Sequence, residues 1–315
     1  MTTSIVTGGA GFIGSHLCTY LVDRGEEVIC IDSLLTGRES NIPLHVWNSD
    51  RFQFVYQDVV ASYFPTKRID YVYHLASPAS PRDYLEHPIH TLKTGAFGTF
   101  HMLGLTKRFD ARFLLASSSE VYGDSLITPQ CEEYNGNVDQ IGPRGVYDES
   151  KRYAEAITMA YHRAHGLNTC IARIFNTFGP KMRLHDGRAV PNFIGQALRG
   201  DPITVYGDGT QTRSFCYITD MVDALYKLMH STYTLPMNLG STEERAILEF
   251  AQLIRALCNS NSEIVFENLP VGDPHQRRPD ISKAKEVLEW SPQVSLEDGL
   301  ARTVDWFRRG EKGVL

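Results

Sequence analysis

The chain has 315 residues, enough for one large α/β domain or for two lobes, and its 42% hydrophobic and 22% charged residues are ordinary for a soluble globular protein. Its net charge of -6 (31 Lys and Arg against 37 Asp and Glu) argues against a nucleic-acid or anionic-membrane partner. No apolar run approaches the ~18 residues of a membrane span, and the six cysteines lack paired spacing, so we expect reduced thiols in a cytoplasmic protein.

Residues 4–31 predict a strand, a tight turn, a helix and a second strand. The first four are a short, β-branched run, and Ile13, Leu17 and Leu21 recur at the spacing of one helix face. Residues 28–31 form the next strand. The chain therefore opens with the β-α-β arrangement that is typical of nucleotide-binding sheets.

Glycines fill the turn between the first strand and its helix. Gly9, Gly11 and Gly14 satisfy G-x-G-x-x-G, and Gly8 extends the pattern to G-x-x-G-x-x-G. Such glycines let backbone N–H groups approach a pyrophosphate at the helix N-terminus. Asp32, at the end of the second strand, is placed to accept both adenosine-ribose hydroxyls and would repel a 2′-phosphate. The pattern favours NAD over NADP; a glycine-rich turn without a ligand is the alternative.

Strands and helices continue to alternate along the first half. Further strands are expected at 53–55, 71–77, 112–119 and 169–176, with long helices at 89–108 and 147–164. This alternation predicts an α/β fold, a Rossmann-like doubly wound parallel sheet, for an NAD-binding domain in residues 1–176. Residues 177–315 are expected to form mainly a smaller α/β substrate lobe, with about 214–245 returning to the first domain.

Two segments of the second half have clear local patterns. Residues 190–200 place Val190, Ile194 and Leu198 on one helix face. Residues 203–218, with turn residues around Gly207 and Gly209, predict a hairpin-like unit.

Polar side chains end the strand in "LLASSSEVYGD", residues 114–124. Because the carboxyl ends of parallel strands face the ligand crevice, these groups are candidates for catalysis, although a plain polar strand exit would look the same. Tyr147 and Lys151, four residues apart, share one helix face. An ammonium beside a phenol, with a positive nicotinamide nearby, lowers the pKa of the phenol. Tyr147 is then suited to take a proton from an alcohol while the hydride goes to NAD.

Other chemistries find less support in the sequence. The serines raise the alternative of a hydrolase, but G-x-S-x-G is absent. The eleven histidines show no metal-binding spacing, so no metal site is predicted.

These motifs, in this order, resemble the extended short-chain dehydrogenase/reductase family. That family carries T-G-G-x-G-F-I-G, a Ser- or Thr-bearing strand end and Y-x-x-x-K. Within it the chain is most similar to the UDP-glucuronate decarboxylases, also called UDP-xylose synthases. The similarity covers essentially the whole chain and includes "HLASPASPRDYLEHP", "LLASSSEVYGD", "IGPRGVYDESKRYAE" and "DPHQRRPDISKAKEVLEW".

The resemblance implies NAD-dependent decarboxylation of UDP-glucuronate to UDP-xylose. Oxidation at C4 makes a β-keto acid, which loses CO2; C5 is then protonated and C4 is reduced again. A nucleotide-sugar 4-epimerase or 4,6-dehydratase of the same family is the main alternative. A catalytically silent NAD-binding protein is the alternative outside the enzymes.

The resemblance also implies a set of site residues. In it, Ser118 stands where a Thr usually hydrogen-bonds the reacting sugar hydroxyl, Ser119 and Glu120 handle the carboxylate and C5, and Arg277 lies near the departing carboxylate. A solvated surface cluster is the alternative for Arg277. The catalytic set is Tyr147, Lys151, Glu120, Ser118, Ser119 and Arg277. The cofactor set is Gly8, Gly11, Phe12, Ile13, Gly14, Asp32, Ser33, Thr36, Gly37, Asp58, Val59, Leu75, Ser77, Thr94, Ser117, Tyr147 and Lys151. The UDP-sugar set is Ala79, Tyr84, Lys93, Arg144, Asn176, Val190, Thr204, Tyr206, Gln211, Arg213 and Arg277.

Three positions depart from the family pattern: Ser118 replaces Thr, and Ser33 and Gly95 replace Asn. The family further implies a homodimer in which the helices at 89–108 and 147–164 pair with their copies as a four-helix bundle. The same apolar residues could equally face the chain's own sheet. They are Leu92, Phe100, Leu103, Ala154, Ile157 and Tyr161.

Overall fold

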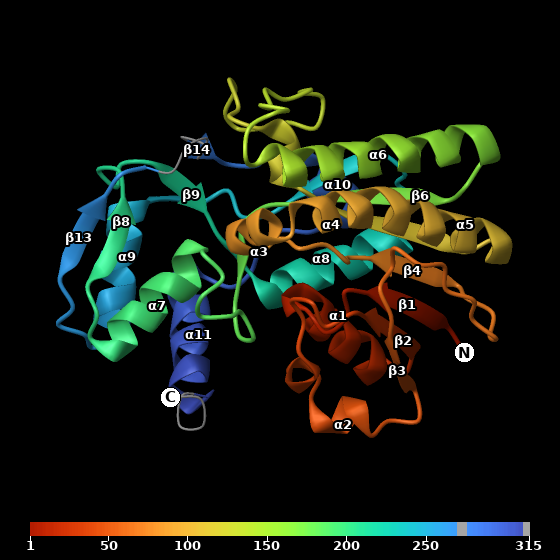
Figure 1. The fold of residues 1–315 in the computed structure, drawn as a ribbon, viewed down its shortest axis with the longest axis horizontal. Coiled ribbons are helices and arrows are strands. Elements are labelled where there is room, and N and C mark those ends of the chain that lie inside the picture. The colour runs from red at the N-terminus through yellow and green to blue at the C-terminus, as the bar shows by residue number, and fades with distance from the viewer. Residues whose placement is uncertain (270–275, 311–315) are drawn as a thin grey trace.

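A seven-stranded parallel sheet forms the centre of the larger part of the molecule (Figure 1). The computed structural model describes residues 1–269 and 276–310. The strand order is β11-β6-β5-β4-β1-β2-β3, so the order reverses beside β1, where ligands of such sheets bind. This confirms the predicted Rossmann-like doubly wound sheet. The strands are β1 (Thr3–Thr7), β2 (Glu27–Asp32), β3 (Phe52–Tyr56), β4 (Tyr71–His74), β5 (Arg112–Ser118), β6 (Thr169–Ile174) and β11 (Pro236–Leu239).

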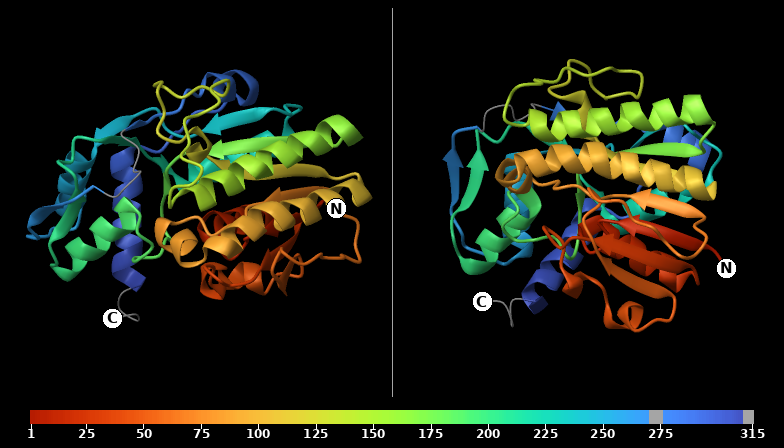
Figure 2. Two further views of the ribbon diagram at one scale, coloured as in Figure 1. Left: turned by 45° about the horizontal axis from the view of Figure 1, so that its top comes forward. Right: turned by 45° about the vertical axis from the view of Figure 1, so that its right-hand side comes forward.

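Both faces of the sheet are covered by helices, which explains why its strands are continuous apolar runs. Neighbouring residues point to opposite faces: Val6 and Leu114 pack with α1 (Phe12–Asp23) and α8 (Ile218–His230), whereas Ile5 and Leu115 belong to a second core. That second core lies beneath the long helices α5 (Thr99–Phe109) and α6 (Gly145–His165). Figure 2 shows the two helical layers from further sides.

The predicted strands at 71–77, 112–119 and 169–176 run past the observed ends at His74, Ser118 and Ile174. Local polar contacts take over there. The N–H groups of Leu75 and Ala76 donate to the Thr7 hydroxyl at 3.1 and 3.2 Å, which turns the chain out of the sheet. The polar tails of these runs therefore lie in loops above the sheet.

The predicted helix at 89–108 is three consecutive helical segments. They are α4 (Pro88–Lys93), a π-helical turn, η2 (Thr94–Gly98), and α5. Gly95 lies in the π turn and touches α6: a Cβ there would come within 2.7 Å of the Ser150 Cβ. The close approach of these two helices leaves no room for a side chain at Gly95.

The smaller lobe consists of short strands and helices. Its β8 (Ile203–Tyr206) pairs in parallel with β13 (Ile264–Glu267). A three-stranded sheet has the order β12-β9-β14. The remaining elements are η1 (Glu39–Asn41), α2 (Leu44–Trp47), α3 (Pro81–Glu86), η3 (Ser119–Tyr122), β7 (Thr177–Phe178), α7 (Ala189–Arg199), β9 (Thr212–Ser214), β10 (Cys216–Tyr217), β12 (Glu244–Ala246), α9 (Ile247–Leu257), β14 (Gln276–Arg277), α10 (Ser282–Leu288) and α11 (Leu296–Gly310).

The predicted hairpin at 203–218 is wrong, because β8 and β9 belong to different sheets. The turn does form, with positive φ at Gly207 and Gly209 (67° and 77°). Its backbone groups are then used by α9 instead of a ladder: Ile247 N–H donates to the Gln211 carbonyl and Leu248 N–H to that of Gly209, both at 3.0 Å. The two strands therefore diverge.

Residues 218–239 lead back from the smaller lobe to the central sheet. Helix α8 packs on α1, and β11 pairs in parallel with β6, with Pro236 opposite Ile171. The last five residues of the predicted second lobe, 311–315, lie outside the described part. Within that part, no helix combines the length and apolarity needed to cross a bilayer.

The contact at Gly95 predicts that Gly95→Ala is destabilising. The added Cβ would overlap Ser150, so we expect a loss of about 1–3 kcal/mol in the free energy of unfolding, as for other overpacked sites. The matched control is Gly104→Ala on α5, where no atom lies within 4 Å of the new Cβ. That change should stabilise by about 0.5–1 kcal/mol. Urea unfolding measures both; equal stabilisation by the two variants would show that the helices have room at Gly95.

Candidate active site

A cavity of about 750 Å³ lies over the carboxyl ends of the central strands and below the smaller lobe. Residues from both parts of the molecule line it, from Gly8 to Arg277. Every residue of the three predicted sets lines this cavity except Gly37 and Lys93. The structure thus brings together residues from opposite ends of the chain.

The glycine turn and Asp32 form one end of the cavity. A Cβ on Gly14 would lie 2.1 Å from the Gly8 carbonyl oxygen, so the turn closes only with glycine there. The Asp32 carboxylate accepts N–H groups of Ala10 (2.9 Å) and Leu34 (2.8 Å), and burial raises its pKa. Gly37 lies behind it, where a Cβ would be 3.0 Å from both carboxylate oxygens. This narrow turn with an adjacent carboxylate fits a dinucleotide.

Lys93 does not reach the cavity, contrary to the sequence-based expectation. Its side chain is exposed on α4, whereas Thr91 and Thr94 on the opposite side of the helix are buried. Thr94 lines the cavity. Because Lys93 stands two residues from Thr91, the helical period turns it away from the sheet.

Tyr147 and Lys151 both lie in the cavity wall on α6. The Tyr147 ring is buried and stacks on Tyr84, with centroids 5.2 Å apart and planes 15° apart. Lys151 Nζ donates to the Ala116 carbonyl of β5 at 2.9 Å and lies 5.7 Å from the Tyr147 ring centroid. The lysine therefore joins the helix that carries the tyrosine to the end of β5.

The expected lowering of the Tyr147 pKa does not occur in the protein alone. Burial raises the pKa of Tyr147 to about 12, although a hydrogen bond with Ser118 opposes the rise. Burial also lowers the pKa of Lys151 to about 8. Desolvation is the largest cause of both shifts, because the low-dielectric interior penalises either charge.

Glu120 is held between two guanidinium groups. Arg277 Nη1 lies 2.5 Å from its Oε1, and Arg277 Nη2 and Arg144 Nη2 donate to its Oε2 at 2.8 and 2.7 Å. Arg277 also donates to the Ser119 hydroxyl at 3.0 Å. Burial opposes ionisation of Glu120, yet Arg277 and Arg144 together lower its pKa to about 2. Glu120 is therefore a carboxylate at neutral pH.

Arg277 is not part of a solvated surface cluster. It is 3% exposed, and it joins β14 of the smaller lobe to the end of β5. The neighbouring Arg278 has a side chain 41% exposed, and its contact with Glu244 is 3.4 Å. The two adjacent arginines therefore differ in their surroundings: Arg277 is buried in the cavity wall, and Arg278 is partly exposed.

Polar groups of the smaller lobe form the other end of the cavity. Gln196 fixes the start of β8, because its amide donates to the Thr204 hydroxyl and accepts from Thr204 N–H, both at 3.1 Å. Gln211 donates to the Tyr206 carbonyl at 2.7 Å. Arg213 on β9 also lines the cavity. Thr204, Tyr206, Gln211 and Arg213 belong to the set expected to bind the UDP-sugar, whereas Gln196 was not predicted.

Among the ionisable groups that sequence reasoning missed near this site, two have clearly shifted pKa values. Asp148 follows Tyr147 directly; burial and the nearby Glu120 raise its pKa to about 7, and its Oδ1 has no hydrogen-bond partner among the described residues. Lys181 lines the cavity after the Gly-Pro pair that follows β7, and burial lowers its pKa to about 8. Their positions next to recognised motifs were the available signal. No group of described His, Cys, Asp and Glu residues could hold a metal ion.

Comparisons with known proteins agree with this geometry. Residues 4–240 match the NAD dependent epimerase/dehydratase family. The chain is 51% identical over 304 residues to UDP-glucuronic acid decarboxylase 1 of Arabidopsis thaliana, covering 96% of this chain and 69% of that protein. It is 52% identical over 305 residues to UDP-glucuronic acid decarboxylase 1 of Danio rerio, covering 97% and 72%.

A solved structure adds a ligand-bound comparison. It is a tyrosine-to-phenylalanine mutant of UDP-glucuronic acid 4-epimerase from Bacillus cereus, in complex with UDP-4-deoxy-4-fluoro-glucuronic acid and NAD. The TM-score is 0.88 at 29% identity, and the match covers 98% of this chain and 99% of that one.

The contacts of Asp32 predict that this residue governs NAD affinity. Hydrogen bonds from the two adenosine-ribose hydroxyls to this carboxylate would be worth about 1.5–3 kcal/mol each, so loss of both in Asp32→Ala should weaken NAD binding roughly 10²–10⁴-fold. Asp32→Asn, which keeps one acceptor oxygen, should weaken it less. Asp23→Ala at an exposed position of α1 is the control. Calorimetric titration measures the affinities; equal affinity of the unmodified protein for NAD and NADP would contradict the assignment.

Proposed function

Because this chain belongs to the NAD dependent epimerase/dehydratase family, we propose that it decarboxylates UDP-glucuronate to UDP-xylose with NAD as its cofactor. The observation that carries this assignment is Glu120, held between Arg144 and Arg277 at the end of the strand that faces Tyr147. The cavity divides accordingly: residues 1–176 with the returning segment bind NAD, and the smaller lobe binds the UDP part of the substrate. The free, mostly buried cysteines support a cytoplasmic protein.

Oxidation and reduction at C4 require a base that returns its proton. NAD, held by the glycine turn and Asp32, would supply the acceptor for the C4 hydride and would return the hydride at the end of the reaction. Tyr147, which shares a hydrogen bond with Ser118, removes the proton of the C4 hydroxyl and later restores it. Lys151, one helical turn away, offsets the negative charge that the phenolate acquires. The cofactor is therefore neither consumed nor released as NADH.

Loss of CO2 requires groups beside the uronate carboxylate. Arg144, Arg277 and the ionised Glu120 together carry one positive charge, which favours a second carboxylate, that of the substrate. Once C4 is a ketone, the bond between C5 and the carboxylate breaks and its electron pair moves into the carbonyl. No metal is needed, because the ketone itself accepts the electrons.

After CO2 has left, C5 must be protonated. Glu120 cannot donate this proton directly at neutral pH, because its pKa is about 2. It is suited to orient a water molecule, with the Ser119 hydroxyl, toward C5. A 4-epimerase, the alternative that the Bacillus cereus neighbour favours, needs no group for C5 chemistry.

We also propose a homodimer formed through the layer of α4, α5 and α6. Several large apolar side chains are exposed on this layer and on the adjoining α3 and η2: Leu85, Ile89, Leu92, Phe97, Phe100 and Tyr153. Leu103 and Ala154 instead belong to the core beneath the helices, and Ile157 and Tyr161 are partly buried against it. Of the six apolar residues named from the sequence, only Leu92 and Phe100 are exposed and could contact a partner. A second copy of this face would cover these residues as a four-helix bundle.

Decarboxylation predicts a specific isotopic product. Turnover of UDP-glucuronate in D2O should release CO2 and place deuterium at C5 of UDP-xylose, with no net NADH. Glu120→Ala should lower turnover roughly 10²–10⁴-fold, the contribution of a well-positioned proton transfer, because the water that protonates C5 loses the carboxylate that orients it. Glu249→Ala, at an exposed position of α9, is the control. Mass spectrometry and NMR identify the product. A C4 epimer formed without CO2, and unaffected by Glu120→Ala, would favour the epimerase.

The exposed face predicts the mass of the protein in solution. Light scattering at micromolar concentration should give twice the 35.4 kDa of the chain. The double change Ile89→Asp and Phe97→Asp should give a monomer, because two carboxylates would be buried in the interface. Leu44→Asp, at an exposed apolar position of α2, is the control and should leave a dimer. A monomeric unmodified protein would exclude the bundle.

A further inference from the structure

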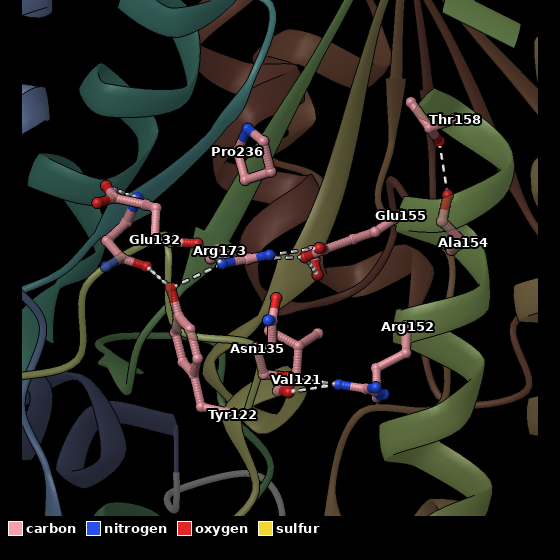
Figure 3. A network of polar contacts seen from close by, with 12 residues as sticks. Val121, Tyr122, Glu132, Asn135, Arg152, Ala154, Glu155, Thr158, Arg173 and Pro236 are labelled. Atoms are coloured by element: carbon pink, nitrogen blue, oxygen red, sulfur yellow. Dashed lines mark hydrogen bonds and ion pairs between the residues drawn. The ribbon is translucent and has the colours of Figure 1, made fainter. Parts of the chain in front are cut away.

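A buried ion pair lies behind the carboxyl end of β5 (Figure 3). Arg173 of β6 binds Glu155 of α6 with two bonds: Nη2 to Oε2 at 2.8 Å and Nε to Oε1 at 3.0 Å. Each side chain is 12% exposed. A buried pair of this kind is often no more stabilising than apolar residues of the same volume. Its contacts, rather than its contribution to stability, point to its role.

The Glu155 carboxylate holds the residue next to the reactive segment. The Ser117 hydroxyl donates to Glu155 Oε1 at 2.6 Å. One turn earlier on α6, Lys151 donates to the Ala116 carbonyl at 2.9 Å. Two successive residues of β5 are thus joined to α6 immediately before Ser118. The distance between Ser118 and Tyr147 is set by these contacts.

The Arg173 guanidinium holds the other end of the same segment. Its Nη1 donates to the Tyr122 hydroxyl at 2.9 Å (Figure 3). Tyr122 donates in turn to Asn238 of β11 at 2.7 Å. Tyr122 is the last residue of η3, the turn that contains Glu120. Arg152 of α6 also donates to the Val121 carbonyl at 3.2 Å. The turn is therefore fastened on both sides of Glu120.

The charge of Glu155 also acts on Lys151. Glu155 stands four residues after Lys151, on the same face of α6. Burial lowers the pKa of Lys151 to about 8, and the Glu155 charge opposes this fall. The other ionisable groups that interact with Lys151 are Tyr147 and His74 of β4. Burial lowers the pKa of His74 to about 3, so it stays neutral in the working range.

We propose that Glu155, held by Arg173, is a positioning residue for the C4 oxidation. It fixes residues 117–122 against the helix that carries Tyr147, and it places a negative charge one turn from the Lys151 ammonium. The proposal rests on the proposed function for its substrate, but it concerns a step that a decarboxylase and a 4-epimerase share. Neither Glu155 nor Arg173 touches the reacting atoms in this scheme.

The test compares Glu155→Gln with the unmodified holoenzyme on UDP-glucuronate. Misplacement of the β5 end should lower kcat about tenfold to hundredfold, with KM changed less than about twofold. Loss of the negative charge should move the alkaline limb of the kcat profile roughly one pH unit lower, because Lys151 then loses its proton more easily. C4 oxidation is followed by absorbance of the bound reduced cofactor in a single turnover, and CO2 release is followed separately.

Two conservative variants separate charge from geometry. Glu155→Asp keeps the charge on a shorter side chain, so kcat should fall while the alkaline limb stays in place. Arg173→Lys keeps the positive charge but loses the two-bond contact, and it should also lower kcat without moving the limb. These variants decide the question if Glu155→Gln does not fold: unchanged kcat in both would overturn the proposal.

The control is Arg112→Lys at the amino end of β5, the strand that ends at Ser118. Arg112 is also a buried guanidinium, and it donates to the carbonyls of Leu228 and Tyr233 at 3.4 and 2.9 Å. This variant should lose stability but keep kcat and the alkaline limb. A Glu155→Gln enzyme that behaves like Arg112→Lys would show a purely structural role. If the unmodified enzyme oxidises C4 but releases no CO2, the decarboxylase assignment is refuted. The proposal for Glu155 is still tested in that case, because the kcat profiles of the unmodified enzyme and Glu155→Gln can still be compared.

Discussion

The attachment of the β5 end to α6 is the constraint on which the site depends. Lys151 and Glu155, one turn apart on the helix, hold the Ala116 carbonyl and the Ser117 hydroxyl. Beyond this point the chain leaves the sheet, and the Ser118 hydroxyl accepts the Glu120 N–H at 3.2 Å to begin a tight turn. The polar side chains at the end of this buried strand are therefore held by the helix that carries Tyr147. Their order along the chain becomes a fixed arrangement in space.

Burial and pairing compete throughout this site, and the outcome differs from group to group. Glu120 loses its water but gains two guanidiniums, so it remains ionised. Tyr147 has a neutral hydroxyl as its partner, and its pKa rises to about 12. Lys151 has a carbonyl, and its pKa falls to about 8. A single desolvated cavity thus contains, at neutral pH, an ionised carboxylate, a neutral phenol and an ammonium that loses its proton more easily than an exposed lysine does.

The smaller lobe completes the site through Arg277. This residue lies 157 positions beyond Glu120 and reaches it from a two-residue strand that pairs with β9, the strand of Arg213. A contact between β14 and Glu120 therefore links the smaller lobe to the turn that follows β5.

Local pattern alone determined the apolar strands, the glycine turn with Asp32 and the Tyr147–Lys151 spacing, because each is set within one or two elements by periodicity and backbone geometry. The family likeness identified most of the cavity. Tertiary structure decided the rest. Strands β8 and β9 lie in different sheets because α9 hydrogen-bonds to the turn between them. Lys93 points away from the cavity. Glu155 contacts Arg173 and Ser117, which lie on two neighbouring strands. Tertiary structure also set the sign of the Tyr147 pKa shift, because desolvation depends on which residues surround a group, and sequence spacing does not specify that.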